Sequence, residues 1–357
     1  MEKDYFRNKR ILIISPENWA HLFVSKHHYA IELAKNNQVY FLNPPSDRWS
    51  HEKTDYKNVQ VINYTPFLKG LRFLPPFLQR FLMRRKYQQL QRLTAVTFDC
   101  VWSFDNSVFF DFSFLPDRVL TISHIVDHSQ DFQLGKAAAT AQVCLGVSQN
   151  IVKKLSRYNR HTYLVPHGLA GSNREAQPQN LPGKNLIKAV YAGNLDSNLI
   201  DFDVLFKLVD KFPQVDFVFF GTGGNGWPGR ANVYRAGRVS TEKLGDYLRS
   251  ADVLLMVYDS EKFPEQLTNA HKVLEYLHAG KVIVSSFVSD YAALPELLNM
   301  AKTNKDLPEL FEQVIADLPF YNDPQKIMQR RQYAERNSYA HRLSEIENII
   351  QNLPQRF

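Results

Sequence analysis

The chain has 357 residues, 44% of them hydrophobic and 22% charged, with a formal net charge of +7; this is typical of a folded protein long enough for two domains. No apolar run approaches the roughly 18 residues of a membrane-spanning helix, and Ile11–Ile14 is too short for the core of a signal peptide. Because Cys100 and Cys144 give neither a disulfide framework nor a metal-ligand spacing, the sequence predicts a cytoplasmic protein.

Short apolar runs alternate with helix-like patterns along the chain, which is typical of βαβ units and parallel sheets. The candidate strands of the first half are Arg10–Ser15, Gln38–Asn43, Val59–Tyr64, Cys100–Phe104, Arg118–Ile122, Val143–Val147 and Thr162–Val165. The polar stretch Ala170–Lys184 has no apolar period and is the predicted linker. The strands then resume with Ala189–Ala192, Asp216–Phe220, Asn232–Gly237, Asp252–Val257 and Val282–Ser285. The pattern predicts an α/β protein with two Rossmann-like, doubly wound domains that face a cleft.

The positive charge is concentrated between Pro66 and Phe98, where seven cations occur without any Asp or Glu: Lys69, Arg72, Arg80, Arg84, Arg85, Lys86 and Arg92. Phenylalanine and leucine residues are interleaved with them, as in a helix that lies on an anionic membrane surface. The alternative is a core-packing helix with a solvated basic face. No nucleic-acid-binding motif accompanies the segment, so nucleic acid is not an expected partner.

Four titratable residues lie within eight positions after a predicted strand: His124, Asp127, His128 and Asp131. At the carboxyl end of a parallel strand they would line a catalytic mouth. The alternative is a polar loop with solvated or helix-capping histidines. The spacing is also compatible with a metal site, but the rest of the chain offers no convincing further ligands, so no metal is expected.

The segment 269–286, NAHKVLEYLHAGKVIVSS, predicts a helix, a tight turn at Gly280 and a buried strand. Lys272 and Glu275 are three residues apart and therefore lie on one side of the helix. A carboxylate near a helix N-terminus can accept sugar hydroxyls, and a lysine one turn away can meet a diphosphate. The alternative is a solvated surface ion pair.

This segment resembles the donor-binding segment of the GT-B glycosyltransferases, in particular the retaining family-four type. The similarity continues in order along the chain, at residues 15–45, 147–168, 191–196 and 218–224. It implies an acceptor-binding domain at residues 1–175 and a nucleotide-sugar-binding domain at 176–335. It further implies that residues 336–357 form a terminal helix that crosses back onto the first domain.

The resemblance implies a role for several residues. Those expected to bind the donor are Lys272, Glu275, Asn269, Gly193, Asn194, Gly221, Gly223 and Arg238. The expected acceptor-side loop contains Glu17, Asn18 and Trp19, and the residues expected near the reacting sugar are His124, Asp127 and His128. Two positions depart from the family pattern: no cation follows Gly193, and Leu267 stands where a first glutamate is usual. The donor would then be held chiefly by Lys272 and helix dipoles, without a metal or other cofactor.

The function predicted from these features is transfer of a sugar from a nucleotide-sugar donor to a glycolipid, polysaccharide or other acceptor. Peripheral attachment through residues 66–93 would place the enzyme on the inner face of the cell membrane. Two alternatives stay open at this level. One is a sugar-nucleotide epimerase, which shares the GT-B architecture, and the other is a non-catalytic scaffold that binds a partner through the basic segment.

Overall fold

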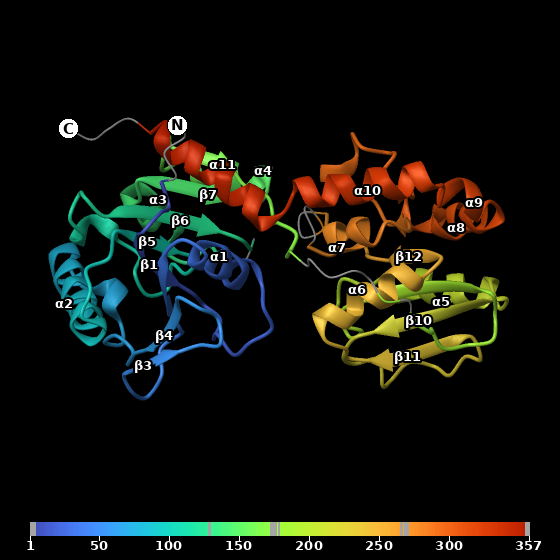
Figure 1. Cartoon of the computed structure of the whole chain (residues 1–357), viewed down its shortest axis with the longest axis horizontal. Helices are drawn as coiled ribbons and strands as arrows, with labels where there is room; N and C mark the ends of the chain where they lie inside the picture. Colours follow the sequence, from blue (N-terminus) through green and yellow to red (C-terminus); the bar gives the residue numbers. More distant parts are fainter. Residues whose placement is uncertain are drawn as a thin grey trace. The chain divides into compact units, whose positions relative to one another are not determined.

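The computed structural model describes residues 5–127, 130–171, 177, 179–264, 267 and 271–353. The chain forms two compact units (Figure 1). Unit 1 comprises Met1–Gly168 and Tyr339–Phe357, and unit 2 comprises Leu169–Ser338. Within the described residues, every helix is too short or too polar to cross a bilayer.

Unit 1 is built on an eight-stranded sheet in the order β3-β4-β2-β1-β5-β6-β7-β8. Its strands are β1 (Arg10–Ile14), β2 (Gln38–Leu42), β3 (Ser50–Lys53), β4 (Val59–Asn63), β5 (Cys100–Ser103), β6 (Leu120–Ile125), β7 (Val143–Gly146) and β8 (Thr162–Leu164). All neighbouring pairs are parallel except β3 with β4.

Helices cover both faces of this sheet, so its central strands are apolar on both sides. The helical segments of unit 1 are α1 (Ser25–Ala34), η1 (Leu71–Phe73), α2 (Pro76–Thr94), η2 (Phe112–Phe114), α3 (Leu134–Thr140), α4 (Gln149–Leu155) and α11 (Tyr339–Gln351). Alternate residues of β1 point to opposite faces. Ile11 and Ile13 belong to the same cluster as α1 and α11, which contact each other, and Leu12 belongs to the cluster under α2.

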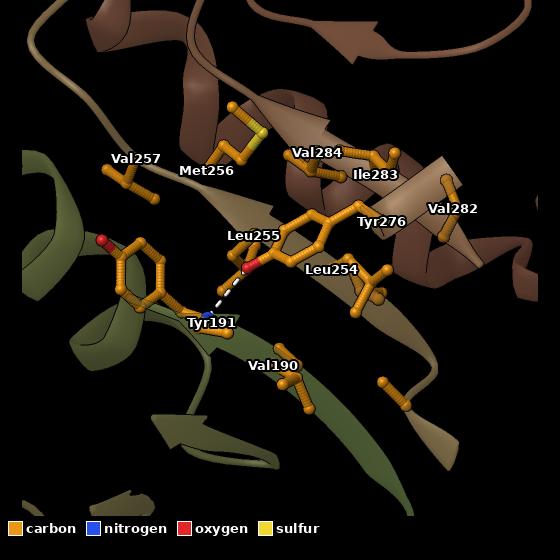
Figure 2. Packing of buried hydrophobic residues seen from close by; sticks show 14 of the residues in the cluster. Val190, Tyr191, Leu254, Leu255, Met256, Val257, Tyr276, Val282, Ile283 and Val284 are labelled. Carbon is orange, nitrogen blue, oxygen red and sulfur yellow. Dashed lines mark hydrogen bonds between the residues drawn. The ribbon is translucent and has the colours of Figure 1, made fainter. Parts of the chain in front are cut away.

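Unit 2 is built on a six-stranded parallel sheet in the order β11-β10-β9-β12-β13-β14. The strands are β9 (Ile187–Ala192), β10 (Val215–Phe220), β11 (Val233–Gly237), β12 (Val253–Met256), β13 (Val282–Ser285) and β14 (Asn299–Met300). The helical segments are α5 (Phe202–Lys211), α6 (Thr241–Ser250), α7 (His271–Ala279), η3 (Ser289–Tyr291), η4 (Asn304–Asp306), α8 (Leu307–Ala316), α9 (Leu318–Tyr321) and α10 (Pro324–Arg336). Figure 2 shows the core in which Tyr276 of α7 packs over β12 and β13.

The predicted α/β class with two doubly wound parallel sheets is confirmed, and each predicted strand overlaps an observed one. Strand β3 was not predicted, because its sequence, SHEK, has no apolar alternation. Strand β6 continues to Ile125, so His124 lies within the strand and not after it. A terminal helix was expected at residues 336–357, and the structure has α11 at Tyr339–Gln351, which belongs to unit 1. The preceding helix, α10, ends at Arg336, and beyond it the Asn337 carbonyl accepts a hydrogen bond from the Leu169 N–H at 2.8 Å.

Candidate active site

The centre of the unit 2 sheet is its topological switch point. From β9 the chain proceeds to β10 on one side, whereas β12 lies on the other side of β9. Ligands of doubly wound sheets bind outside the carboxyl ends of the strands at such a point. Gly193 directly follows β9, and Tyr258 comes two residues after β12. The two residues therefore mark the place where this fold would receive a ligand.

Lys272, in the first turn of α7, reaches this switch point. Its ammonium group lies 3.8 Å from the centre of the Tyr191 ring and 4.9 Å from that of Tyr258, and it donates a hydrogen bond to the Tyr258 hydroxyl. No carboxylate of the described residues lies within ion-pair distance of it. A cation held by aromatic faces and a neutral hydroxyl keeps its charge available for an anion.

Two glycines make room for this cation. Gly193 has a φ of +152°, and a Cβ there would lie 2.8 Å from the Lys272 Nζ. Gly221, after β10, has a φ of +144°, and a Cβ would lie 1.7 Å from the Gly193 carbonyl oxygen. Only glycine fits either position, so the loops after β9 and β10 touch backbone to backbone beside the lysine.

Further hydrogen bonds fix these loops to each other. Leu195 N–H donates to the Thr222 carbonyl, and Gly224 N–H donates to Asp196 Oδ1, both at 2.8 Å. Asn194 is exposed, and its Oδ1 accepts from Asp196 N–H at 3.0 Å. Gly223 has a φ of +94° and lies against the Asp196 carboxylate. The segment with Gly221 and Gly223, which are expected to bind the donor, is thus an ordered turn joined to the β9 loop.

The remaining donor-side residues lie at different places. Glu275 is exposed one turn after Lys272, yet enough protein surrounds it to raise the pKa of its carboxyl, an effect that Lys272 opposes. Arg238 is exposed just after β11. Because β11 is two strands from β9, the end of β11, which Arg238 follows, is about 10 Å across the sheet from the end of β9. A bound nucleotide is long enough to span this distance. Asn269 lies outside the described residues.

Helix α7 is held rigidly at its far end. Gly280 has a φ of +85°, in the left-handed region, and ends the helix at the predicted turn. Two arginines of α10 bind the last carbonyls: Arg330 Nη1 donates to Gly280 at 2.9 Å and Arg331 Nη2 to Ala279 at 3.2 Å. The Tyr276 hydroxyl accepts from the Ala192 N–H at 2.8 Å, the dashed line in Figure 2. These bonds fix the helix that carries Lys272 and Glu275 to the end of β9.

The loop of unit 1 that is expected to face the acceptor is organised by side chains and not by glycines. Glu17 forms an ion pair with Lys26, which is 3% exposed in the first turn of α1. Trp19 N–H donates to Asn43 Oδ1 at 2.8 Å, and its ring packs against those of Phe23, His27, Phe41 and Tyr56. Asn18 is exposed, and its Oδ1 accepts from the Ala20 N–H. The loop lies at the carboxyl end of β1, beside the switch point between β1 and β5.

The three residues expected near the reacting sugar have different surroundings. His124 is fully buried among the rings of Tyr29, Trp102 and Phe104, and its Nδ1 accepts from Trp102 Nε1 at 3.3 Å. Burial lowers its pKa to about 3, so this imidazole is neutral, and its Nε2 has no hydrogen-bond partner among the described residues. Asp127 is exposed beyond β6, and His128 lies outside the described residues.

Several residues near the carboxyl ends of the strands were not predicted from the sequence to belong to the site. Tyr191 and Tyr258 look like core aromatics there, and only the folded chain brings both to Lys272. Burial raises the pKa of Tyr191 well above its usual value, so its phenol stays protonated. In unit 1, Asn106 follows β5 and is 5% exposed, and neither polar atom of its amide has a partner among the described residues. A buried, unpartnered amide is costly, which marks Asn106 as a candidate ligand contact.

Comparisons with known proteins fit this geometry. Residues 203–348 match the family described as "Glycosyl transferase-like". Sucrose-phosphate synthase from Thermosynechococcus elongatus superposes with a TM-score of 0.68 at 14% identity, over 97% of this chain and 99% of that one. The trehalose-6-phosphate synthase OtsA gives 0.64 at 13%, over 97% and 100%. HepE from Anabaena, in complex with UDP-glucose, gives 0.65 at 12%, again over 97% and 100%. No curated protein sequence matches the chain.

At these identities the structural likeness establishes the fold, which is GT-B. The family match over residues 203–348, which includes α7, adds the class of activity. The chain is a glycosyltransferase of the GT-B fold, as the sequence resemblance implied.

Proposed function

We propose that the protein transfers a glycosyl group from a nucleoside-diphosphate sugar to a glycolipid or a growing polysaccharide. The observation that carries this proposal is the Lys272 ammonium group, which lies at the switch point of unit 2 and has no carboxylate partner among the residues that the structure describes. HepE, of the same fold, has been solved in complex with UDP-glucose, which supports a donor of this class.

In the proposed reaction the donor's diphosphate binds Lys272 and the N-terminus of α7, where the helix dipole adds positive character. Negative charge develops on this diphosphate as the glycosidic bond breaks, so a fixed cation there stabilises the transition state. Glu275 accepts hydroxyls of the ribose or of the transferred sugar. Gly193, Asn194, Gly221, Gly223, Asn269 and Arg238 complete the donor surface in this proposal. Lys272 supplies the charge that a metal would otherwise provide, so activity is expected to survive EDTA.

Unit 1 is proposed to bind the acceptor through the loop that contains Glu17, Asn18 and Trp19. Contact of His124, Asp127 and His128 with the reacting sugar stays a prediction. For His124 it requires that the surrounding aromatic side chains move apart, because the imidazole is closed off from solvent. Asp127 is already exposed. Retention of the anomeric configuration also stays a prediction of the resemblance.

The acceptor is proposed to be membrane-linked because of the charge of residues 66–93. This segment has seven cations and no acidic residue, and those that face solvent would hold it at an anionic bilayer on the cytoplasmic side, each contributing about 1 kcal/mol. Attachment would be peripheral and reversible.

The test is turnover of nucleotide sugars with and without added acceptor. Candidate nucleotides are first compared by thermal shift with UDP, GDP, ADP, CMP and TDP, since a ligand at about 100 times its Kd adds about 2.7 kcal/mol to stability. A transferase consumes the donor in proportion to the amount of acceptor added. Donor consumption at the same rate with and without acceptor would indicate the epimerase or a hydrolase. No turnover and no nucleotide response would leave the non-catalytic scaffold.

A further inference from the structure

The surface around the start of α2 carries large apolar side chains that the core does not use. Leu68 is 65% exposed, Phe73 77%, Phe77 69% and Phe81 58%. Phe77 and Phe81 are one turn apart, so they lie on one side of the helix. Leu68 and Phe73 precede α2, and Phe77 and Phe81 lie in its first two turns. We call these four residues together the apolar face of α2 (α2 is labelled in Figure 1).

Packing of α2 on its own sheet does not explain this face. The helix is already anchored by a different set of residues, which are buried: Gln79, Met83, Tyr87, Leu90 and Thr94. Met83, Tyr87 and Leu90 belong to the core cluster of unit 1, whereas Phe77 and Phe81 do not. The alternative of a core-packing helix with a merely basic outer side is therefore wrong for these phenylalanines. Grouped exposed aromatics of this kind mark an interaction surface.

The segment that carries the apolar face also carries exposed cations without acidic partners among the described residues. Lys69, Arg72, Arg85 and Arg92 are exposed, and none forms an ion pair with any described carboxylate. Arg72 lies over the rings of Phe73, at 4.6 Å, and Phe132, at 5.3 Å. Arg80 differs, because it faces the buried Asp111 at 3.4 Å and helps to fix the helix. Exposed phenylalanines with unpaired cations beside them match the boundary between anionic headgroups and acyl chains.

We propose that Phe73, Phe77 and Phe81 insert into an anionic lipid bilayer, while Lys69, Arg72 and Arg85 contact lipid phosphates. This deepens the membrane attachment proposed above and rests on it. A second copy of the chain is a poorer occupant, since a symmetric contact would bring these like charges together. Insertion can also be distinguished from purely electrostatic attachment. High salt screens the surface charges, but it does not remove the free energy gained by burying apolar side chains in the bilayer.

The test compares vesicle binding of the full-length protein with that of two variants. The first carries Phe73→Ser, Phe77→Ser and Phe81→Ser together; the control is Phe320→Ser, which removes a phenylalanine of unit 2 that is 56% exposed. Vesicles contain phosphatidylcholine with or without phosphatidylglycerol. We expect the wild type and the control to prefer anionic vesicles and to stay partly bound in high salt. The triple variant should lose about tenfold in partitioning per phenylalanine removed.

Depth is measured with Phe77→Trp, whose fluorescence should be quenched by lipids brominated on the acyl chain, while Phe320→Trp should not be quenched. Unchanged vesicle binding by the triple variant, or equal binding to neutral vesicles, would overturn the proposal. So would a lipid-free wild-type dimer that the triple variant converts to a monomer. Nucleotide thermal shifts are recorded on the same variants. If the vesicle experiments contradict insertion but nucleotides still raise the Tm, only the insertion proposal is refuted. If no nucleotide raises the Tm of the wild type, the proposed function is refuted.

Discussion

Each unit has a lysine in the first turn of a helix, and the two lysines have opposite surroundings. Lys26 is the second residue of α1, the helix that follows the switch-point strand β1, and Lys272 is the second residue of α7, which follows β12. Lys26 is buried and neutralised by Glu17. Lys272 is partly exposed, held by two tyrosines and bordered by glycine.

A cation in the first turn of a helix opposes the helix dipole. In unit 1 a carboxylate offsets this repulsion, and the ion pair becomes part of the structure of the acceptor-side loop. In unit 2 no described carboxylate lies within ion-pair distance of Lys272, although the Glu275 carboxylate one turn on attracts it. An anionic ligand would relieve the remaining repulsion. A lysine in the first turn of a helix therefore indicates little by itself, whereas its partners distinguish a structural role from a binding role.

The largest effect on stability is expected from Glu17→Gln. This change leaves Lys26 buried without its counter-charge and should lower the free energy of unfolding by roughly 3 kcal/mol. The double variant Lys26→Met and Glu17→Gln should recover most of the loss, because no unpaired charge remains. Denaturant unfolding measures both. Equal losses for the single and double variants would show that the ion pair is not what holds this loop.

Gly193→Ala should lower kcat/KM by up to about a hundredfold, the scale of one catalytic charge interaction. Its Cβ would lie 2.8 Å from the Lys272 Nζ and displace the cation. The control is Gly237→Ala, which also places alanine at a positive φ, +73°, but has no atom within 4 Å of the new Cβ. Similar kinetics of the two variants would mean that backbone strain, and not the position of Lys272, sets the rate.

Glu275→Ala should lower kcat/KM ten- to a hundredfold with little change in Tm, since a hydrogen bond to a charged group contributes about 1.5–3 kcal/mol. The carboxylate is exposed, and its proposed role is to accept hydroxyls of the donor. Glu309→Ala, at an exposed position in the first turn of α8, serves as control. An unaltered rate combined with a large drop in Tm would assign Glu275 a structural role.

At neutral pH the smallest effect is expected from His124, because its contribution to stability changes only towards acid. Its pKa is about 3 in the folded chain because of burial, against about 6.5 when unfolded. As the pH falls below about 6.5, the unfolded state binds a proton that the folded state does not. Stability is therefore lost towards acid, at up to about 1.4 kcal/mol per pH unit. His124→Phe should flatten this loss between about pH 7 and 4 in unfolding experiments. An identical pH profile would indicate that the imidazole is accessible to solvent.

Much of the fold could be predicted from the sequence, because buried parallel strands such as Val282–Ser285 are continuous apolar runs between turn residues. The helix with Lys272 and Glu275 could be placed for the same reason, together with the Gly280 turn. The partners of Lys272 could not, since Tyr191 and Tyr258 are far from it in the chain and become its neighbours only when β9 and β12 pair. His124 was expected in a loop because polar residues follow it, yet the β6 ladder continues past it.

The central claim is that the Lys272 ammonium group binds the diphosphate of the donor. Calorimetric titration of the nucleotide identified by thermal shift tests it most directly, using the wild type, Lys272→Met and the control Lys207→Met, which changes an exposed lysine of α5. We predict that Lys272→Met weakens nucleoside diphosphate binding about ten- to a hundredfold, with binding of the nucleoside alone unchanged. Lys207→Met should bind like the wild type. Equal affinity of Lys272→Met and wild type for the diphosphate would contradict the account.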